Sequence, residues 1–293
     1  DLNNRKYISY DDAQNQKYFE HNYLGTDSID KTKRTSIKNT IGIALQEGFN
    51  KWAKAGLTAF LSYEYRNFAL TDTTNIPGQR IINNYKESSL SIGGELSKKQ
   101  GKLLHYNILG ELAIAGEDAG QFSVEGRGDL NLRLFGDTVR LDVNAFIKNQ
   151  NPVFYFRHFQ SKHYWWDNND LSKIMRTRLE GKLSLNRWGT QLRAGVENIK
   201  NYTYLANASI PVKDSEGNVT GFKNNAAVRQ HSGNIQIFTA MLQQKLKVGI
   251  FHLDGEVAYQ KSSEQDILPL PELSAYGNLY MKFGLAKKVL QIE

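Results

Sequence analysis

Cysteine is absent from the 293-residue chain. Disulfide bonds, thiolate nucleophiles and cysteine-ligated metals are therefore excluded. Long hydrophobic runs are missing too, since no apolar stretch approaches the ~18–20 residues that a transmembrane helix requires. A helical membrane protein is thereby excluded, but a transmembrane β-barrel is not, because its hydrophobic signal is weak in each segment. Proline is scarce, at 5 residues, and tyrosine abundant, at 15, which suits many strands with little proline-rich linker.

What the sequence does contain is hydrophobic alternation with a period of two. In "LTAFLSYEYRN" (57–67) the odd positions from Leu57 to Tyr65 are apolar or aromatic, and Thr58, Ser62, Glu64 and Arg66 lie between them. Such a pattern predicts a strand with one polar and one apolar face. This predicted strand is longer than most strands of globular proteins.

The same pattern recurs along the chain and predicts about twelve strands. Most are near the ~9–11 residues that cross a bilayer when tilted. Their expected ranges are 35–46, 57–67, 88–97, 103–115, 121–134, 138–148, 173–186, 190–199, 233–248, 250–260 and 277–286, with one more beginning at Val289. In 233–248, Ile235 and Ile237 share one parity, and the apolar residues from Phe238 onward take the other. A β-bulge within this segment would explain that switch.

The connections between the predicted strands alternate between short and long. The short ones are turn-rich, and they are 48–52, 98–102, 135–138, 186–190, 247–249 and 286–288. The others are 67–84, 116–120, 149–172, 202–232 and 261–273, of which all but 116–120 are long. Outer-membrane barrels show this asymmetry, with short periplasmic turns and longer extracellular loops. A soluble sandwich has no reason to shorten every second connection.

These patterns predict an all-β fold, an antiparallel up-and-down transmembrane β-barrel over residues 35–293. The apolar face of each strand would contact lipid, and the polar face would line a lumen. The inward positions are too charged for a dry core, because unpaired buried charge is prohibitive. Residues 1–34 form a polar N-terminal segment whose structure the sequence does not indicate. Net charge is +7, which fits an anionic lipid surface, an anion-lined pore or nucleic acid.

Several segments resemble the putative porin family of Bacteroidetes outer membranes. They are "NTIGIALQEGFNKWAKAGLTAF" (39–60), "GRGDLNLRLFGDTVRLDVNAF" (126–146) and "GIFHLDGEVAYQKSSEQDILPLPELSAYGNLY" (249–280). "SKHYWWDNN" (161–169) is similar to a further motif of that family, with Lys162 where asparagine is usual. The resemblance implies a β-barrel of the bacterial outer membrane and little about its solute. Barrels of this kind finish on a strand with a terminal aromatic residue, so we expect this chain, ending at Glu293, to lack the last strands.

Charged residues at predicted inward positions are the first group of candidate functional residues. Fixed charges on a lumen wall set the ion preference of a pore. The alternative is an ion-pair network that holds the barrel rigid or plugs it. The candidates are Glu111, Glu125, Arg127, Asp129, Arg133, Arg140, Asp142, Arg176, Arg178, Glu180 and Arg193.

An aromatic-rich stretch in the predicted extracellular loop 149–172 is the second group. It consists of Phe154, Tyr155, Phe156, Tyr164, Trp165 and Trp166. Such a cluster could bind a ligand or fold into the pore as a constriction. The alternative, which we favour, is a packed loop core or an interfacial aromatic girdle. His158 and His163 are five residues apart in this loop, and a metal site would need further ligands.

Motifs for catalysis are missing from the sequence. There is no H-E-x-x-H, G-x-S-x-G or P-loop pattern, and we expect neither enzymatic activity nor a cofactor or metal. Inward-facing His105 and His252 leave open a hydrolase assembled from different strands. The tripeptide Arg127-Gly128-Asp129 matches an adhesion motif, but it lies inside a predicted strand, so chance explains it better. The basic residues are scattered over strands, and nucleic-acid binding is not expected.

Two functions remain. The first is a porin-like barrel that passes small hydrophilic solutes or ions by passive diffusion through a charged, water-filled lumen. The second is a closed or plugged barrel that serves as a scaffold for a secretion, assembly or surface-lipoprotein complex. A TonB-dependent transporter would need a plug domain before the barrel, and we expect residues 1–34 to be too short for one. Outer-membrane lipid and lipopolysaccharide are the expected surroundings.

Overall fold

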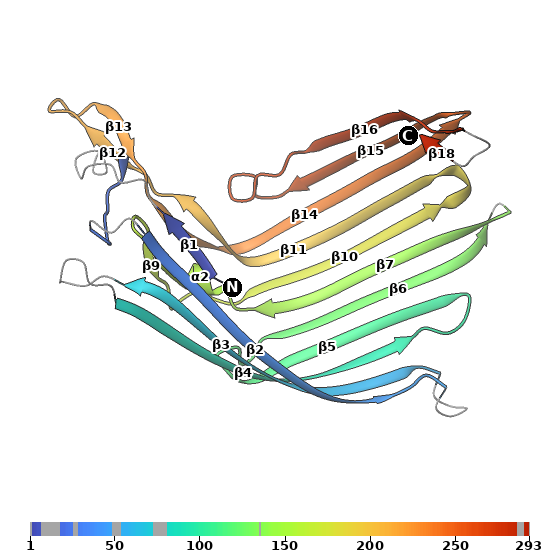
Figure 1. Ribbon diagram of the computed structural model, residues 1–293, viewed down its shortest axis with the longest axis horizontal. Helices are drawn as coiled ribbons and strands as arrows, with labels where there is room; N and C mark the ends of the chain where they lie inside the picture. Colours follow the sequence, from blue (N-terminus) through green and yellow to red (C-terminus); the bar gives the residue numbers. More distant parts are fainter. Residues whose placement is uncertain are drawn as a thin grey trace.

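The computed structural model describes residues 2–6, 18–25, 29–48, 54–72, 81–134, 136–285 and 290–292. Most of them belong to one twelve-stranded sheet (Figure 1). In spatial order its strands are β1 (Leu2–Lys6), β2 (Ile29–Leu45), β3 (Gly56–Asp72), β4 (Ile81–Lys98), β5 (Leu104–Gly116), β6 (Phe122–Leu134), β7 (Asp137–Gln150), β10 (Ile174–Leu185), β11 (Thr190–Asn207), β14 (Ala226–Val248), β15 (Phe251–Ser262) and β16 (Leu273–Met281). No helix among the described residues is long and apolar enough to cross a membrane.

The large sheet is antiparallel throughout. Each of its strands pairs with the strand of this sheet that follows it along the chain. It is twisted and curved (Figure 1). The predicted all-β, up-and-down antiparallel fold is thus confirmed. Among the described residues no pairing joins β1 to β16, so the sheet is open along that edge. β1 and the first part of β2 lie within residues 1–34, for which the sequence had indicated no structure.

Three small two-stranded sheets lie outside the large sheet. They are β8 (His158–Gln160) with β9 (Trp165–Asp167), β12 (Ile210–Lys213) with β13 (Val219–Lys223), and β17 (Phe283–Leu285) with β18 (Leu290–Ile292). α2 (Phe154–Arg157) and the 3-10 turn η1 (Asn186–Trp188) are short helical segments in the connections of the sheet. The strand predicted over 277–286 is therefore divided into β16 and β17, and β17 pairs with β18 rather than with the large sheet.

Short connections lie at one end of the large sheet and the longer ones at the other, as Figure 1 shows. Residues 99–103, 186–189 and 249–250 make tight turns at the first end. The connections 151–173, 208–225 and 263–272 lie at the second end. At Gly189, φ is +63°, and a Cβ atom would lie 2.4 Å from the carbonyl oxygen of Lys245, so this turn requires glycine.

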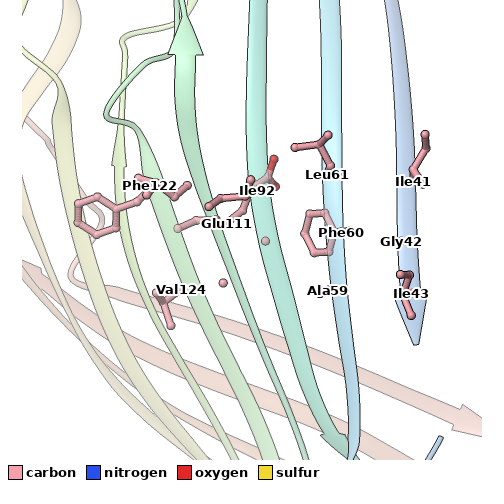
Figure 2. A pocket seen from close by; sticks show the side chains of 14 residues that line it. Ile41, Gly42, Ile43, Ala59, Phe60, Leu61, Ile92, Glu111, Phe122 and Val124 are labelled. Atoms are coloured by element: carbon pink, nitrogen blue, oxygen red, sulfur yellow. The ribbon is translucent and has the colours of Figure 1, made fainter. Parts of the chain in front are cut away.

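One face of the sheet exposes an almost unbroken surface of large apolar side chains. Ile41 is 78% exposed and Leu279 is 72% exposed, although they lie at opposite edges of the sheet. A shallow groove of about 920 Å³ crosses this surface over β2–β6, and Figure 2 shows Ile43, Leu61 and Ile92 around it. A water-soluble monomer rarely exposes so large an apolar surface. This face is therefore the lipid-facing surface.

A bulge at the change of parity in 233–248 is wrong. β14 pairs with β15 in an unbroken register from Ile237 to Val248, and its register with β11 shifts before that point, where Ser232 and Gly233 of β14 oppose Asn201 of β11. Asn201 has φ +59°. Ile235 and Ile237 instead point to the polar face, where Ile235 is completely buried opposite Ile199. The change of parity is thus an apolar patch on the inner face, not a bulge.

Phe60 is an aromatic residue on the polar face, and it lies over a glycine of the next strand. A Cβ atom on Gly93 would come within 2.2 Å of the Phe60 ring and 2.7 Å of the carbonyl oxygen of Gly110. Gly93 pairs with Phe60 on β3 and with Glu111 on β5. The ring covers backbone that glycine leaves bare, a known means of supporting glycine in sheets.

We therefore expect Gly93→Ala to destabilise the large sheet by ~1–3 kcal/mol, because overpacking forces both the ring and the backbone to move. Phe60→Ala in the same chain should recover part of the loss, since the contact with Gly110 would remain. The temperature at which the folded band disappears in heat-modified gel electrophoresis measures this. Equal stability of Gly93→Ala and the unaltered chain would contradict the prediction.

Candidate functional site

The polar face of β5–β11 carries two ionic clusters. The first joins β5, β6, β7 and β10 around two aspartates. Arg140 lies 2.7 Å from Asp142 and 3.7 Å from Asp129, measured between guanidinium nitrogens and carboxylate oxygens. Lys182 approaches Asp142 at 3.1 Å, and Nδ1 of His105 lies 2.9 Å from Asp129. The rows of paired residues place these side chains together because alternate positions on neighbouring strands share a face.

The second cluster is centred on Glu197 of β11. Arg176 donates to Oε1 of Glu197 from Nε at 2.8 Å, and Arg178 lies 3.7 Å from Oε2. Arg178 also pairs with Glu180, whose other oxygen lies 3.8 Å from Arg193. Glu197 and Glu180 are mostly buried beneath these arginines, which are more exposed. The arginine side chains therefore form the accessible surface of this part of the wall.

The remaining predicted wall residues form no ion pair with these two clusters within the described part of the chain, although Arg127 lines one cavity together with the first cluster. Glu111 pairs with Lys38 at 3.7 Å, and Glu125 pairs with Lys148 at 2.7 Å. Arg127 and Arg133 make no ion pair within the described part of the chain. The sequence interpretation missed Glu197, Lys148, Lys182 and His105 as partners. All four had the correct parity for this face, so alternation alone could have identified them.

The aromatic-rich stretch folds back onto the polar face, over the ends of β3 and β4 nearest the long connections. We call residues 151–168 the inner loop. The ring of Phe154 stacks on Phe68 of β3, with 3.7 Å between ring centroids, and His158 stacks on Tyr85 of β4 at 4.7 Å. Phe68 and Leu70 are buried there, although they occupy inward positions in a strand. These inward apolar residues form the surface on which the inner loop docks.

An ionic network fixes α2 of the inner loop to the wall. Arg157 reaches Glu87 of β4 and Glu117 at 2.7 Å each. Glu87 is only 7% exposed and is shared with Arg66 of β3 at 3.1 Å. Arg66 in turn lies 2.7 Å from Asp118 in the turn between β5 and β6. Because most of these groups are shielded from water, the interactions are screened less than surface ion pairs.

The second half of the inner loop is a small aromatic core. Phe159 stacks on Trp166 at 4.8 Å, and Nε1 of Trp166 donates to the carbonyl oxygen of Tyr155 at 2.9 Å. Trp165 contacts Tyr23 edge to face, and Tyr164 contacts Phe19 in the same way. Phe156 lies in α2, and its backbone N–H donates to the carbonyl oxygen of Val153. The six predicted aromatic residues thus all lie in the inner loop, but they do not form a single cluster. Phe154 packs on β3, and the others pack within the loop or against residues 19–23.

The two histidines of the inner loop have different surroundings. His158 hydrogen-bonds Asp167, whereas Nδ1 of His163 lies 2.9 Å from the carbonyl oxygen of His21. No group of three or more metal-ligating side chains occurs among the described residues. The inner loop is therefore held on the polar face by aromatic packing, hydrogen bonds and ion pairs.

Acid is expected to weaken docking of the inner loop. Burial raises the pKa of Asp118, but hydrogen bonds from Arg66, Ser89 and Gln121 outweigh it and hold that pKa below its ordinary value. Stability from Asp118 is thus present above pH ~4 and lost as pH falls through the lowered pKa. Burial lowers the pKa of His163, so its contribution is lost as pH falls below ~6.5.

Acrylamide quenching of Trp165 and Trp166 between pH 8 and pH 3, in a chain that carries Trp52→Phe and Trp188→Phe, measures this effect. We expect quenching to rise in acid, and Asp118→Asn should show high quenching already at neutral pH. Lys213→Gln, at an exposed position of β12, is the control and should follow the unaltered chain. Quenching that does not change with pH would contradict the prediction.

Comparisons with known proteins agree with this architecture. The sequence profile of the family described as "Putative porin" matches residues 2–293. No curated protein matches the chain in sequence. Among solved structures, the siderophore receptor PirA from Pseudomonas aeruginosa has a TM-score of 0.58 at 11% identity, covering 88% of this chain and 47% of the receptor. The chain therefore spans less than half of that receptor's length.

Two further structures are similar at lower scores. The RagAB peptide importer gives a TM-score of 0.46 at 11% identity, covering 81% of this chain and 32% of that one. The outer membrane transporter YddB from Escherichia coli gives 0.36 at 14% identity, covering 95% and 40%. The family match over nearly every residue, with the lipid-facing sheet described above, decides the assignment. This chain belongs to the putative porin family and is a β-strand protein of the bacterial outer membrane.

Proposed function

We propose that the chain forms part of the wall of a passive diffusion pathway for small hydrophilic solutes or ions, with the inner loop as its constriction and without enzymatic activity. The observation that carries this proposal is the docking of residues 151–168 on the polar face by the Arg157–Glu87–Arg66 network. A loop held there narrows the lumen without crossing the lipid-facing surface. The family segments quoted above support a host among the Bacteroidetes.

The charged clusters suit such a pathway because they supply polar groups along the wall. Glu197 and Glu180 lie beneath arginines that remain accessible, so a passing anion would meet guanidinium groups. Aspartates 129 and 142 are similarly covered by Arg140 and Lys182. A wall with alternating fixed charges produces a transverse field and discriminates between ions.

Single-channel conductance in planar bilayers, with reversal potentials in a salt gradient, tests the proposal. The protein is purified from outer membranes so that it is measured as it exists. Stepwise openings with a reproducible ion preference support a diffusion pathway. A correctly folded protein that gives no openings across the full voltage range would overturn it.

A scaffold is the second candidate, and the β12–β13 hairpin favours it. This hairpin stands apart from the large sheet at the end with the long connections (Figure 1). Phe222 is 64% exposed on it, and Val219 and Ile210 are exposed as well. An apolar surface of this kind, rimmed by polar residues, is typical of a protein-contact site. Loss of a co-purifying protein on Phe222→Ser, with unchanged conductance, would support a scaffold role.

A further inference from the structure

Charge is distributed unevenly on the lipid-facing surface. Every aspartate and glutamate of β2–β7, β10, β11, β14 and β15 whose side chain is described occupies an inward position in the strand registers. Lysines do occur at outward positions. Lys98 lies toward the short turns, whereas those toward the long connections are Lys31, Lys33, Lys86, Lys200 and Lys261.

A second groove, of about 830 Å³, lies on this surface across β7, β10, β11, β14 and β15. One row of paired residues in it is apolar and exposed, with Leu179, Val196 and Phe238 side by side. Lys261 ends that row, directly opposite Phe238. Its side chain is exposed and makes no ion pair within the described part of the chain.

The next row toward the long connections is polar. It places Thr177 opposite Asn198, and Asn198 opposite Gln236. Lys200 follows on β11, two residues further toward the same end. Hydroxyl and amide groups at this depth cannot be satisfied by acyl chains. The groove therefore combines an apolar row that ends at an exposed cation with a hydrogen-bonding row beside it, on the side of the long connections.

We propose that this groove binds a phosphorylated, multiply acylated glycolipid of the lipopolysaccharide class. Long connections mark the extracellular side of an outer-membrane barrel, so the groove opens to the outer leaflet. Acyl chains lie along Leu179, Val196 and Phe238, and a phosphate group contacts Lys261. The amide and hydroxyl row hydrogen-bonds the sugar. Complementary charge supports this occupant, since cationic residues near a membrane surface attract anionic headgroups.

The groove over β2–β6 offers an internal comparison. Its outward side chains, including Ile41, Ile43 and Leu61, are apolar, and no lysine lines it. That groove is suited to any acyl chain, whereas the groove beside Lys261 has the features that recognise a phosphorylated headgroup. A specific lipid is thus expected at one groove and not at the other.

The test is native mass spectrometry of the delipidated protein, titrated with hexa-acylated bisphosphoryl lipid A. Lys261→Glu should weaken binding about tenfold, because charge reversal replaces attraction by repulsion. Lys261→Arg keeps the positive charge and should bind lipid A as the unaltered chain does. Leu179→Trp should weaken lipid A binding by filling the groove without changing the charge. Lys98→Glu makes the same charge change at the other end of the sheet and should bind as the unaltered chain does.

The outcomes separate the alternatives. Equal lipid A binding by Lys261→Glu, Leu179→Trp and the unaltered chain would overturn the proposal. Equally strong binding of phosphatidylglycerol would show an unspecific anionic-lipid contact and would also overturn it. Folding of each variant is checked by heat-modified gel mobility, and Lys261→Gln replaces Lys261→Glu if the latter does not fold. Conductance is unaffected by these outward substitutions, so the result is independent of the proposed pore.

Discussion

Replacing Arg157 by glutamate is expected to release the inner loop and to raise single-channel conductance severalfold. The substitution places a third carboxylate beside Glu87 and Glu117, which Arg157 now bridges at 2.7 Å each. Breaking a buried ion pair by removing one partner costs about 3–5 kcal/mol. The loop then keeps its aromatic contacts with β3 and β4 and its hydrogen bonds to the chain around His21, but loses its ionic link to the wall.

Release of the loop can be measured separately from conductance. The chain contains no cysteine, so Ser161→Cys introduces a unique thiol at a position that is buried in the docked loop. At one fixed pH, maleimide labelling of this thiol should be slow in the otherwise unaltered chain and fast with Arg157→Glu. Lys213→Glu is the control, since it makes a charge change at an exposed position of β12.

Two outcomes would contradict this account. Fast labelling with unchanged conductance would show that the loop docks but does not constrict the pathway. Slow labelling in Arg157→Glu would show that the ionic network does not hold the loop. The first result would favour the scaffold function. The second would show that the aromatic contacts and hydrogen bonds are sufficient to hold the loop.

Neutralising Arg176 and Arg178 together is expected to shift the reversal potential toward cations. Both guanidinium groups converge on Glu197, and Arg178 also pairs with Glu180. With glutamine at both positions, two carboxylates remain on the wall without these partners and favour cations in the pathway. Glutamate at both positions should shift the potential further in the same direction, provided that the barrel still folds.

A matched control removes the same charge from the other face. Lys200→Gln with Lys261→Gln also lowers the net charge by two, but both lysines lie at outward positions. Its reversal potential should equal that of the unaltered chain. Equal shifts in the two double variants would show that net charge, and not the wall, sets the preference. No shift in the arginine variant would exclude these residues from the pathway.

Local alternation was sufficient to predict the wall and its two faces. Side chains alternate strictly along a strand, so the odd-numbered residues from Leu57 to Tyr65 must share one face. The structure exposes that face to lipid. The lengths of the connections likewise predicted the two different ends of the sheet. Most of the wall charges were found this way, because Arg140 and Asp142, or Arg178 and Glu180, share a parity within one strand.

Tertiary structure alone decided what meets the polar face. Phe68 and Leu70 lay in the connection predicted over 67–84, whereas β3 continues through them and the inner loop covers them on the polar face. The same holds for Ile235, whose parity suggested a bulge but whose side chain is buried on the inner face. Arg157 and Glu87 are 70 residues apart, and only the return of a long loop brings them together. Strand faces follow from local geometry, whereas loop docking depends on long-range contacts that no local pattern records.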